Sequence, residues 1–427
     1  MKLAVVVQRY GADINGGAEL HARYIAERLA GRAEVEVLTT CARDYITWRN
    51  DLPAGGDTVN RVKVRRFPVA SPRKPERFGR LSNLVFDRTH SVADELRWLS
   101  AEGPTSPALI GHIRRVRNDF DFFIFFSYRY YHAWHGARAV PDKAILVPTA
   151  ERDPALGLAI FPPVLAGVRA VIYNSLEERA LIEHLSGREG PSIVVGVGSD
   201  IPAQPDARRF RRKFNVRRPF AIYIGRIDEN KGCAELFAYF QRYAALYPSG
   251  LDLVLVGSNV LQIPKHPRIR HLGFLSDEDK FDALAASDLL VMPSRYESLS
   301  MVALEAWALG KPVLVSGRCD VLRGQAVRSS AGLYYEDFDQ FAECLYALEG
   351  SGPLSSILGG NGREFFARNY AWPVIERKYL EMFDRLAREA SPAPMAPLPG
   401  WLARRRRDAP PARRVVDEAP TGPVGRP

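Results

Sequence analysis

The sequence predicts an α/β fold built from two doubly wound, Rossmann-like sheets. Short apolar runs alternate with helical patterns along almost the whole chain, which is typical of βαβ units. The chain has 427 residues, enough for two domains of ordinary size. Gly, Ser, Asp and Pro cluster at residues 196–205, so we expect an N-terminal domain (1–198) and a C-terminal domain (199–370) to meet there.

The apolar runs that we expect to form strands are distributed over both domains. Between Ser71 and Gly111 the pattern is irregular and longer than a usual crossover, which predicts an inserted helical or loop element. Residues 363–389 predict a final helix that breaks at Trp372-Pro373, and the Pro- and Arg-rich composition after Ser391 predicts a disordered tail (391–427). The expected strands are 2–8, 35–40, 62–68, 121–127, 144–149, 170–175 and 192–197, then 221–225, 252–257, 269–273, 288–293 and 312–316.

Composition limits the class of protein. The apolar fraction of 46% and the charged fraction of 25% are those of a soluble globular protein, and no apolar run reaches transmembrane length. Residues 1–8 are too short and too strand-like for a signal peptide. The four cysteines are scattered, which favours a reducing cytoplasm over a disulfide framework or a zinc site. We therefore expect a cytoplasmic protein without a metal site.

The net charge of +10 is concentrated in three segments, at residues 61–80, 208–218 and 404–407. A nucleic-acid partner is the obvious interpretation, but no nucleic-acid-binding motif accompanies the charge, so we expect none. A solvated basic surface is the simplest alternative, and we favour it for residues 208–218, where a helix is expected.

Two glutamates follow a predicted strand of the C-terminal domain: Glu297 in the loop beyond it and Glu305 about two helical turns later. Ligands of open α/β sheets bind at the carboxyl ends of strands, beside helix N-termini. Carboxylates there accept sugar and ribose hydroxyls, while the amides of Leu299, Ser300 and Met301 are free to hold a phosphate. A solvated loop residue is the simpler interpretation of Glu297. The apolar neighbours of Glu305 instead predict a buried carboxylate that needs partners.

A second segment places two cations at the end of another predicted strand. Gly225 supplies a tight turn, and Arg226 and Lys231 flank the short loop before the next helix. Two cations at a strand end, beside a helix N-terminus, neutralise a leaving diphosphate without a metal. The alternative is an ion pair of Arg226 with Asp228 and a solvated lysine. Together with the two-glutamate segment, the phosphate-binding interpretation is strongly preferred.

The first predicted strand leads into a double glycine, Gly16-Gly17, ahead of a helix that begins Ala18-Glu19. Glycines let a backbone approach a phosphate or a sugar closely, with helix amides directed at it. Because a double glycine at a β–α turn is often only turn geometry, this segment alone is weak evidence.

In their order and spacing, these three segments resemble the retaining GT-B glycosyltransferases of family 4 (glycosyl transferases group 1), over roughly residues 3–386. The resemblance implies a GT-B fold, with two domains facing a central cleft and a final helix (371–390) that crosses back to the first domain. It also implies retaining, metal-independent transfer of a hexose from a nucleoside diphosphate sugar to a saccharide or lipid-linked acceptor, in polysaccharide or glycolipid synthesis, without a cofactor. If the acceptor is lipid-linked, the enzyme works at a membrane surface. The basic segments would then contact anionic lipid headgroups at the inner face of the plasma membrane.

The resemblance implies a role for each matching residue. Arg226 and Lys231 would neutralise the diphosphate, Glu297 would serve the transferred sugar, and Glu305 would serve the ribose. The Gly16-Gly17 turn would line the cleft for donor and acceptor.

Two other features of the donor site follow from the same comparison. The family usually has Phe-Gly where this chain has Leu299-Ser300, and serine is a competent N-cap that preserves the helix start. Recognition of the base in this fold is often by backbone groups, which we expect around Gly273 and Leu275 and around residues 257–259.

One position departs from the family. Relatives often place a histidine near the reacting sugar where this chain has Glu151. A carboxylate accepts a hydrogen bond from a sugar hydroxyl but does not donate as imidazolium does, which puts the sugar preference or catalysis in question. His132 and His135, in an aromatic loop after the strand at 121–127, are alternative site histidines, although that loop suits core packing at least as well.

Two alternative functions remain open at this stage. A sugar-nucleotide epimerase or a phosphorylase shares the GT-B fold, but a phosphorylase would need a pyridoxal-binding lysine that the sequence does not identify. A non-catalytic glycosyltransferase-like subunit would bind a sugar or a partner enzyme; Glu151 supports it, and the otherwise intact motifs oppose it.

Overall fold

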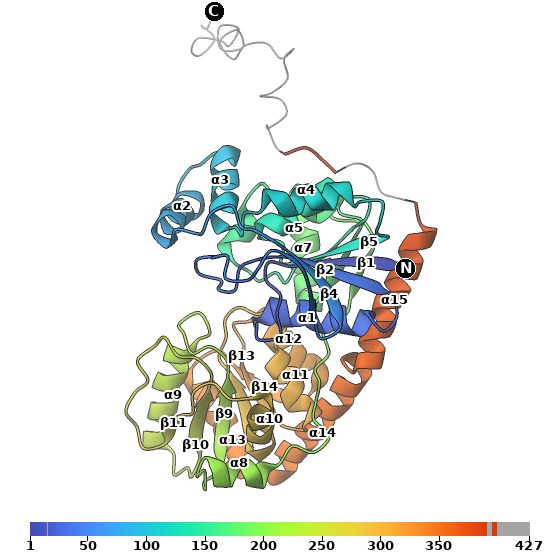
Figure 1. Cartoon of the computed structure of the whole chain (residues 1–427). Helices are drawn as coiled ribbons and strands as arrows, with labels where there is room; N and C mark the ends of the chain where they lie inside the picture. Colours follow the sequence, from blue (N-terminus) through green and yellow to red (C-terminus); the bar gives the residue numbers. More distant parts are fainter. Residues whose placement is uncertain (15, 391–394, 399–427) are drawn as a thin grey trace, which may run out of the picture.

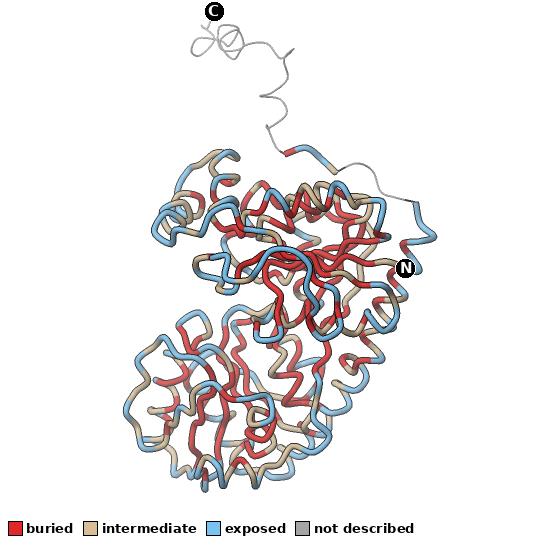
Figure 2. Tube along the Cα trace, in the orientation of Figure 1, coloured by how far each residue is buried: buried red, intermediate tan, exposed pale blue. Residues whose placement is uncertain are grey.

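The computed structural model of the chain describes residues 1–14, 16–390 and 395–398. Two β-sheets, each covered by helices, lie one above the other in Figure 1, and the helix α15 (Trp372–Arg388) runs along one side from the lower sheet to the upper one. Figure 2 shows that the buried residues are concentrated in the two sheets and the helix faces against them. The prediction of two Rossmann-like sheets is confirmed.

The N-terminal sheet has the strand order β3-β4-β2-β1-β5-β6-β7-β8, with every neighbouring pair parallel except β3 and β4. Its central strands are buried on both faces, and the all-apolar run Phe122–Phe126 is the clearest example. The strands β2, β4 and β3 are added on one side of β1, and the strands β5 to β8 are added on its other side. The strand order therefore reverses between β1 and β5. The strands are β1 (Lys2–Val6), β2 (Glu34–Thr40), β3 (Gly55–Val59), β4 (Val62–Phe67), β5 (Phe122–Phe126), β6 (Ala144–Val147), β7 (Ala170–Tyr173) and β8 (Ser192–Val194).

The C-terminal sheet is parallel throughout, in the order β11-β10-β9-β12-β13-β14. Its strand order reverses between β9 and β12. Such a reversal leaves a crevice at the carboxyl ends of the strands, where the loops diverge to opposite faces. The strands are β9 (Phe220–Ile224), β10 (Asp252–Val256), β11 (Ile269–His271), β12 (Leu289–Met292), β13 (Val313–Ser316) and β14 (Gly332–Tyr335).

The segment between β4 and β5 forms three helices, α2 (Pro75–Asp87), α3 (Val92–Glu102) and α4 (Pro107–Arg115), as the irregular sequence pattern predicted. Ser91 starts α3 with a reciprocal capping box to Asp94. The remaining helices are α1 (Gly17–Leu29), α5 (Tyr131–Ala139), α6 (Pro162–Gly167), α7 (Leu176–Ser186), α8 (Ala207–Lys213), α9 (Cys233–Leu246), α10 (Asp277–Ala286), α11 (Met301–Ala308), α12 (Asp320–Ser329), α13 (Phe338–Gly350) and α14 (Gly352–Asn369).

The chain passes between the two sheets twice, after β8 and again between α14 and α15, where the expected break near Trp372-Pro373 is found. The two passages touch: the Trp372 indole N–H donates to Asp200 Oδ1 at 2.7 Å. A Cβ atom added to Gly198 would lie 2.8 Å from the Trp372 ring, so the glycine permits this close approach.

The helix α15 buries Ile375, Tyr379 and Phe383, and Phe383 stacks on Phe122 of β5 with ring centroids 5.8 Å apart. Its C-terminal end is fixed by the buried Arg169, which donates to the carbonyl oxygens of Leu386 (2.7 Å), Glu389 (2.5 Å) and Ala390 (2.5 Å). A guanidinium there satisfies carbonyl groups that have no partner within the helix and stabilises the negative end of its dipole.

Most of the predicted tail (391–427) lies outside the described residues. Within it, residues 395–398 are described, and Leu398 is packed into the core of the N-terminal sheet. None of the helices in the described part of the chain is both long and apolar enough to cross a bilayer.

Candidate active site

A cleft of about 410 Å³ lies between the two sheets, at the carboxyl ends of the strands that flank both order reversals. The N-terminal domain contributes the segments after β1, β2, β5, β6, β7 and β8, and the C-terminal domain contributes those after β9 and β12. The lining residues are Gln8, Gly17, Ala18, Glu19, His21, Tyr45, Ser127, Tyr128, Arg129, Tyr130, Thr149, Glu151, Asp153, Asn174, Val197, Arg226, Lys231, Glu297, Ser298, Leu299 and Met301.

Lys231 and Glu297 form an ion pair in this cleft, with Nζ and Oε1 2.8 Å apart. The lysine backbone is held in place by its amide, which donates to Asp228 Oδ1 at 2.8 Å. Burial alone lowers the pKa of Lys231, but the nearby carboxylates of Glu297 and Glu151 outweigh it, so the pKa is raised and the lysine remains charged. Lys231 therefore provides a fixed positive charge in the cleft, and Glu297 beside it provides a fixed hydrogen-bond acceptor.

Glu151 also lines the cleft, in the loop after β6. Burial raises its pKa to about 7; the charge of Lys231 acts in the opposite direction, and that of Glu297 adds to the rise. Near neutral pH a large share of the molecules carries a protonated Glu151, which donates a hydrogen bond as well as accepting one. The adjacent Arg152 points to Asp320, 3.0 Å away, rather than to Glu151.

The loop that carries Glu151 is held by the buried carboxyl of Glu178 on α7. Its two oxygens accept from the backbone amides of Ala150 and Asn174, each at 2.5 Å. Glu178 thereby joins the loops that follow β6 and β7, which positions Glu151 and Asn174 on the cleft wall.

Arg226 pairs with Asp228, as the simpler interpretation of the sequence predicted. Its guanidinium also donates to the hydroxyl of Tyr45 at 2.7 Å, across the cleft from the N-terminal domain. The Arg226 side chain is 40% exposed and lines the cleft, so the pairing with Asp228 orients it without removing it from the site.

Glu305, on α11, is 2% exposed and has the partners that its burial requires. Oε1 accepts from Ser199 Oγ at 2.8 Å and from Lys280 Nζ at 3.0 Å. Oε2 has no hydrogen-bond partner in the described part of the chain. Glu305 does not line the 410 Å³ cleft itself; it lies one helix turn beyond Met301, which does.

The start of α11 faces the cleft. Leu299 and Met301 line it, while Ser300 is the N-cap residue and its Oγ accepts from the Ala303 amide at 3.4 Å. The first N–H groups of a helix have no acceptor within the helix, so they are available to an anion in the cleft.

The predicted glycines divide between the cleft wall and its supports. Gly17 lines the cleft, whereas Gly16 precedes it as the N-cap of α1. Gly225 and Gly273 lie beyond strand ends, on either side of Gly257. The Gly257 amide donates to the Gly273 carbonyl oxygen at 2.8 Å. A Cβ atom added to Gly257 would lie 2.0 Å from the Gly225 carbonyl oxygen, so only glycine fits there. Leu275 packs into the core, and neither it nor Gly273 lines the cleft.

Several lining residues were not predicted from the sequence. Arg129 pairs with Asp153 and with Glu102, at 2.9 Å each, and joins the loops after β5 and β6. Arg129 and Asp153 both follow predicted strand ends, and that position in the sequence could have identified them as site residues. No sequence feature identifies Tyr45, because its contact with Arg226 crosses between the domains.

Among the buried polar atoms of the cleft wall that have no hydrogen-bond partner in the described residues are Gln8 Oε1, His21 Nε2 and Asn174 Oδ1. Burial lowers the pKa of His21 to about 3, so its ring is neutral. Unpaired buried acceptors and donors are costly unless a ligand satisfies them, and a ligand with several hydroxyls suits this wall.

The two alternative histidines are not in the cleft. His132 is fully buried, with Nε2 3.0 Å from the Phe126 carbonyl oxygen, and His135 packs between Tyr131 and Trp134. Burial lowers the pKa of both to about 4. Both belong to the packing of α5. Within the described ranges, no group of three or more His, Cys, Asp or Glu side chains is arranged to hold a metal ion.

Comparison with known proteins agrees with this arrangement. The family described as glycosyl transferases group 1 matches residues 218–349. The phosphatidyl-myo-inositol mannosyltransferase of Propionibacterium freudenreichii is 31% identical over 159 residues, 37% of this chain and 40% of that protein. The D-inositol 3-phosphate glycosyltransferase of Corynebacterium urealyticum is 24% identical over 417 residues, 89% of this chain and 93% of that protein. In the first curated relatives that it matches, the chain spans between a third and a half of their length.

Solved structures share the fold at low sequence identity. The Anabaena protein HepE, crystallised with UDP, has a TM-score of 0.67 at 16% identity, covering 90% of this chain and 100% of that chain. Sucrose-phosphate synthase from Thermosynechococcus elongatus has a TM-score of 0.65 at 16% identity, covering 90% and 99%. The fold is GT-B, and residues 218–349 of this chain match the family described as glycosyl transferases group 1.

Proposed function

We propose that this protein is a retaining glycosyltransferase that moves a hexose from a nucleoside diphosphate sugar to a saccharide or lipid-linked acceptor, in polysaccharide or glycolipid synthesis. The observation that carries the proposal is the meeting of Glu151, Lys231 and Glu297 in one cleft, although they follow three different strands of two sheets. The match of residues 218–349 to the glycosyl transferases group 1 and the unsatisfied polar atoms of the cleft wall support it.

In this proposal, Lys231 and Arg226 stabilise the negative charge that develops on the leaving diphosphate. The free amides at the start of α11 add donors, so the charge is met by groups already in place. No metal is required for this role.

The three glutamates then divide the remaining contacts. Glu297 accepts hydrogen bonds from hydroxyls of the transferred sugar, and Glu305 offers its unpartnered Oε2 to the ribose. Glu151, which has a pKa of about 7, both donates to and accepts from the sugar or the acceptor. Its burial thus supplies the hydrogen-bond donor that an ordinary carboxylate would lack.

Binding of the bare nucleotide tests the division between two of these glutamates. Calorimetry with UDP and GDP, compared between wild type, Glu305→Ala and Glu297→Ala, should show weaker binding only for Glu305→Ala, since ribose contacts need no sugar. Glu297→Ala should keep nucleotide affinity and lose sugar transfer. Equal losses of affinity in both variants would contradict the assignment.

Donor turnover by the purified protein separates this function from a non-catalytic sugar-binding subunit. UDP-glucose is the first donor to test, because HepE, which has the same fold, was crystallised with it. Release of UDP by wild type and its loss in Lys231→Ala would support the transferase. A protein that binds UDP but turns over neither UDP- nor GDP-sugars would support the subunit.

A further inference from the structure

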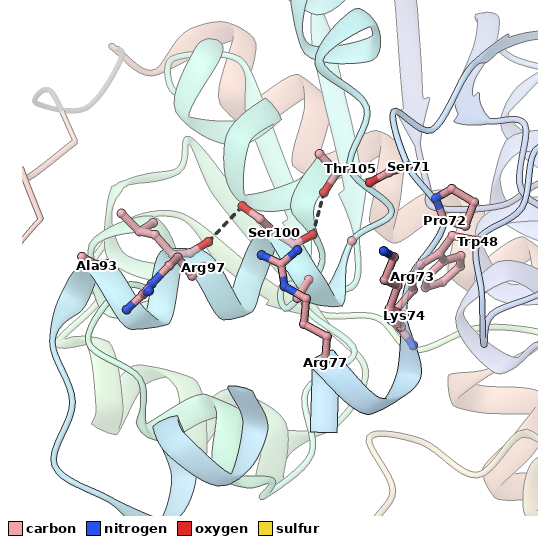
Figure 3. Close-up of a pocket in the computed structure, with 13 residues that line it drawn as sticks. Trp48, Ser71, Pro72, Arg73, Lys74, Arg77, Ala93, Arg97, Ser100 and Thr105 are labelled. Atoms are coloured by element: carbon pink, nitrogen blue, oxygen red, sulfur yellow. Dashed lines mark hydrogen bonds between the residues drawn. The ribbon is translucent and has the colours of Figure 1, made fainter. Parts of the chain in front are cut away.

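A second cavity, of about 470 Å³, lies in the N-terminal domain between α2, α3 and the segment that leads into α2 (Figure 3). Four of its lining side chains are cationic, namely Arg73, Lys74, Arg77 and Arg97, and three others carry hydroxyl groups. Among the described residues that line it there is no carboxylate. We refer to this cavity as the basic pocket.

One of the four cations is fixed in place. Arg73 donates to the Glu102 carbonyl oxygen at 2.5 Å, to Glu102 Oε2 at 2.9 Å and to the Tyr45 carbonyl oxygen at 3.1 Å. Its guanidinium also lies 4.9 Å from the ring centroid of Trp48, which forms part of the pocket wall. Arg73 therefore forms a rigid, positively charged side of the pocket.

Two other cations lack counter-charges. Lys74 and Arg77 are exposed, and within the described ranges neither has a carboxylate within 4.0 Å. Arg97 pairs with Asp94 of its own helix. In Figure 3 Arg77 points from α2 toward α3, and Lys74 lies beside Arg73. Like charges around one hollow repel each other, and an anion in the hollow relieves the repulsion.

The basic pocket is coupled to the active-site cleft through shared residues. The Glu102 carboxylate accepts from Arg73 on the pocket side and pairs with Arg129 on the cleft side, at 2.9 Å each. The loop containing Tyr45 and Trp48 separates the two cavities: Trp48 lines the basic pocket, and the Tyr45 hydroxyl contacts Arg226 in the cleft.

We propose that the basic pocket binds a phosphate group carried by the acceptor, while the acceptor hydroxyl lies in the cleft. This inference rests on the proposed transferase function and names the acceptor class: a phosphate ester. Guanidinium groups bind phosphate oxygens in pairs, and the hydroxyls of Ser71, Ser100 and Thr105 offer further donors. The same chemistry occurs in a phospholipid headgroup and in a sugar phosphate.

The test is binding of glycerol 1-phosphate to the full chain by calorimetry, without donor, so that its outcome does not depend on transfer. The double variant Lys74→Ala/Arg77→Ala should bind at least about tenfold more weakly, because hydrogen bonds to charged groups are lost. Arg80→Ala removes one charge from the same helix outside the pocket and should keep wild-type affinity. UDP binding should be equal in all three proteins, which separates this result from a failure of the donor site.

Vesicles distinguish the two sources of phosphate. Binding to phosphatidylglycerol vesicles that exceeds binding to glycerol 1-phosphate, and that is lost in the double variant, assigns the site to a lipid phosphate. If glycerol 1-phosphate binds the basic pocket equally well with and without vesicles, the site is assigned to the phosphate of a soluble sugar phosphate. Equal glycerol 1-phosphate affinities in wild type and a double variant with an unchanged unfolding midpoint would overturn the proposal.

Discussion

At the scale of single residues, the chemistry of the cleft depends on cations that are held before a substrate arrives. Lys231→Ala and Arg226→Ala should each raise the barrier to turnover by about 2–4 kcal/mol, the range for losing a preorganised charge-stabilising group. Arg226→Lys should not restore the rate fully, because the planar guanidinium that contacts both Asp228 and Tyr45 is lost. Steady-state donor turnover measures both effects, with the exposed Lys63→Ala as control. Near-normal turnover in either alanine variant would exclude that residue from the phosphate role.

The pKa of Glu151 gives the second prediction at this scale. It is raised to about 7 by burial, so deprotonation takes place within the assay range. If the protonated carboxyl donates to the sugar or the acceptor, the rate should fall as the pH rises through about 7. Glu151→Gln donates at every pH and should lack this fall. The measurement is kcat/KM from pH 5.5 to 8.5, and parallel pH profiles for wild type and variant would show that Glu151 does not titrate in the reaction.

The residue scale also shows how far the sequence predicts the site. Lys231 and Glu297 each follow an apolar run, and the carboxyl ends of parallel strands share one edge of a sheet, so these two were predicted to lie together. The position of Glu151, which follows a strand of the other sheet, was implied only by the resemblance to the family. The mutual distances of these residues, and the pKa of Glu151, depend on burial between two domains, which no local pattern records. Tyr45 was missed for the same reason.

At the scale of secondary-structure elements, the central strands were the easiest to predict, because burial on both faces leaves a continuous apolar run, as in β5, β9 and β12. The strand β3 was not predicted, because Gly55-Gly56-Asp57 has low β propensity and lies at an exposed, antiparallel edge. The strand β14 was missed as well; it is a four-residue edge strand next to β13. The helices α2 to α4 were predicted only as an inserted helical or loop element, without their number or bounds.

The fixed end of α15 gives a prediction about an element. Arg169→Ala removes the buried donor to three carbonyl groups at the end of this helix and should lower the free energy of unfolding by about 1–3 kcal/mol. Arg377→Ala, an exposed change on the same helix, should cost less than about 1 kcal/mol. Urea unfolding of the two variants measures the difference, and equal midpoints would show that Arg169 does not anchor the helix.

At the scale of the whole molecule, ion pairs join the two domains at one edge of the cleft. Arg328 of α12 pairs with Glu177 of α7, and Arg152 pairs with Asp320. Partly exposed pairs contribute little to unfolding stability, but they favour a closed cleft over an open one. The double variant Arg152→Ala/Arg328→Ala should therefore keep its unfolding midpoint and increase its radius of gyration in small-angle scattering at low salt. Lys213→Ala, which breaks a pair within the C-terminal domain, should not; an unchanged radius in the double variant would contradict the role.

The domain boundaries at 198/199 and 370/371, and peripheral contact with an anionic membrane, remain predictions of the sequence. Limited proteolysis tests the first, because the exposed residues 202–204, next to the expected boundary, should be cut before either domain is. Flotation with anionic vesicles tests the second.

The double passage of the chain between the sheets restricts how the molecule opens. Two covalent connections lie side by side and touch through Trp372, Asp200 and Gly198. Rotation about the line through both connections leaves their lengths unchanged, whereas twisting one domain on the other stretches one connection and compresses the other. We therefore expect the molecule to open by rotation about this line, which would carry the loops of the two sheets apart along one arc and return Lys231 and Glu297 to the same position beside Glu151.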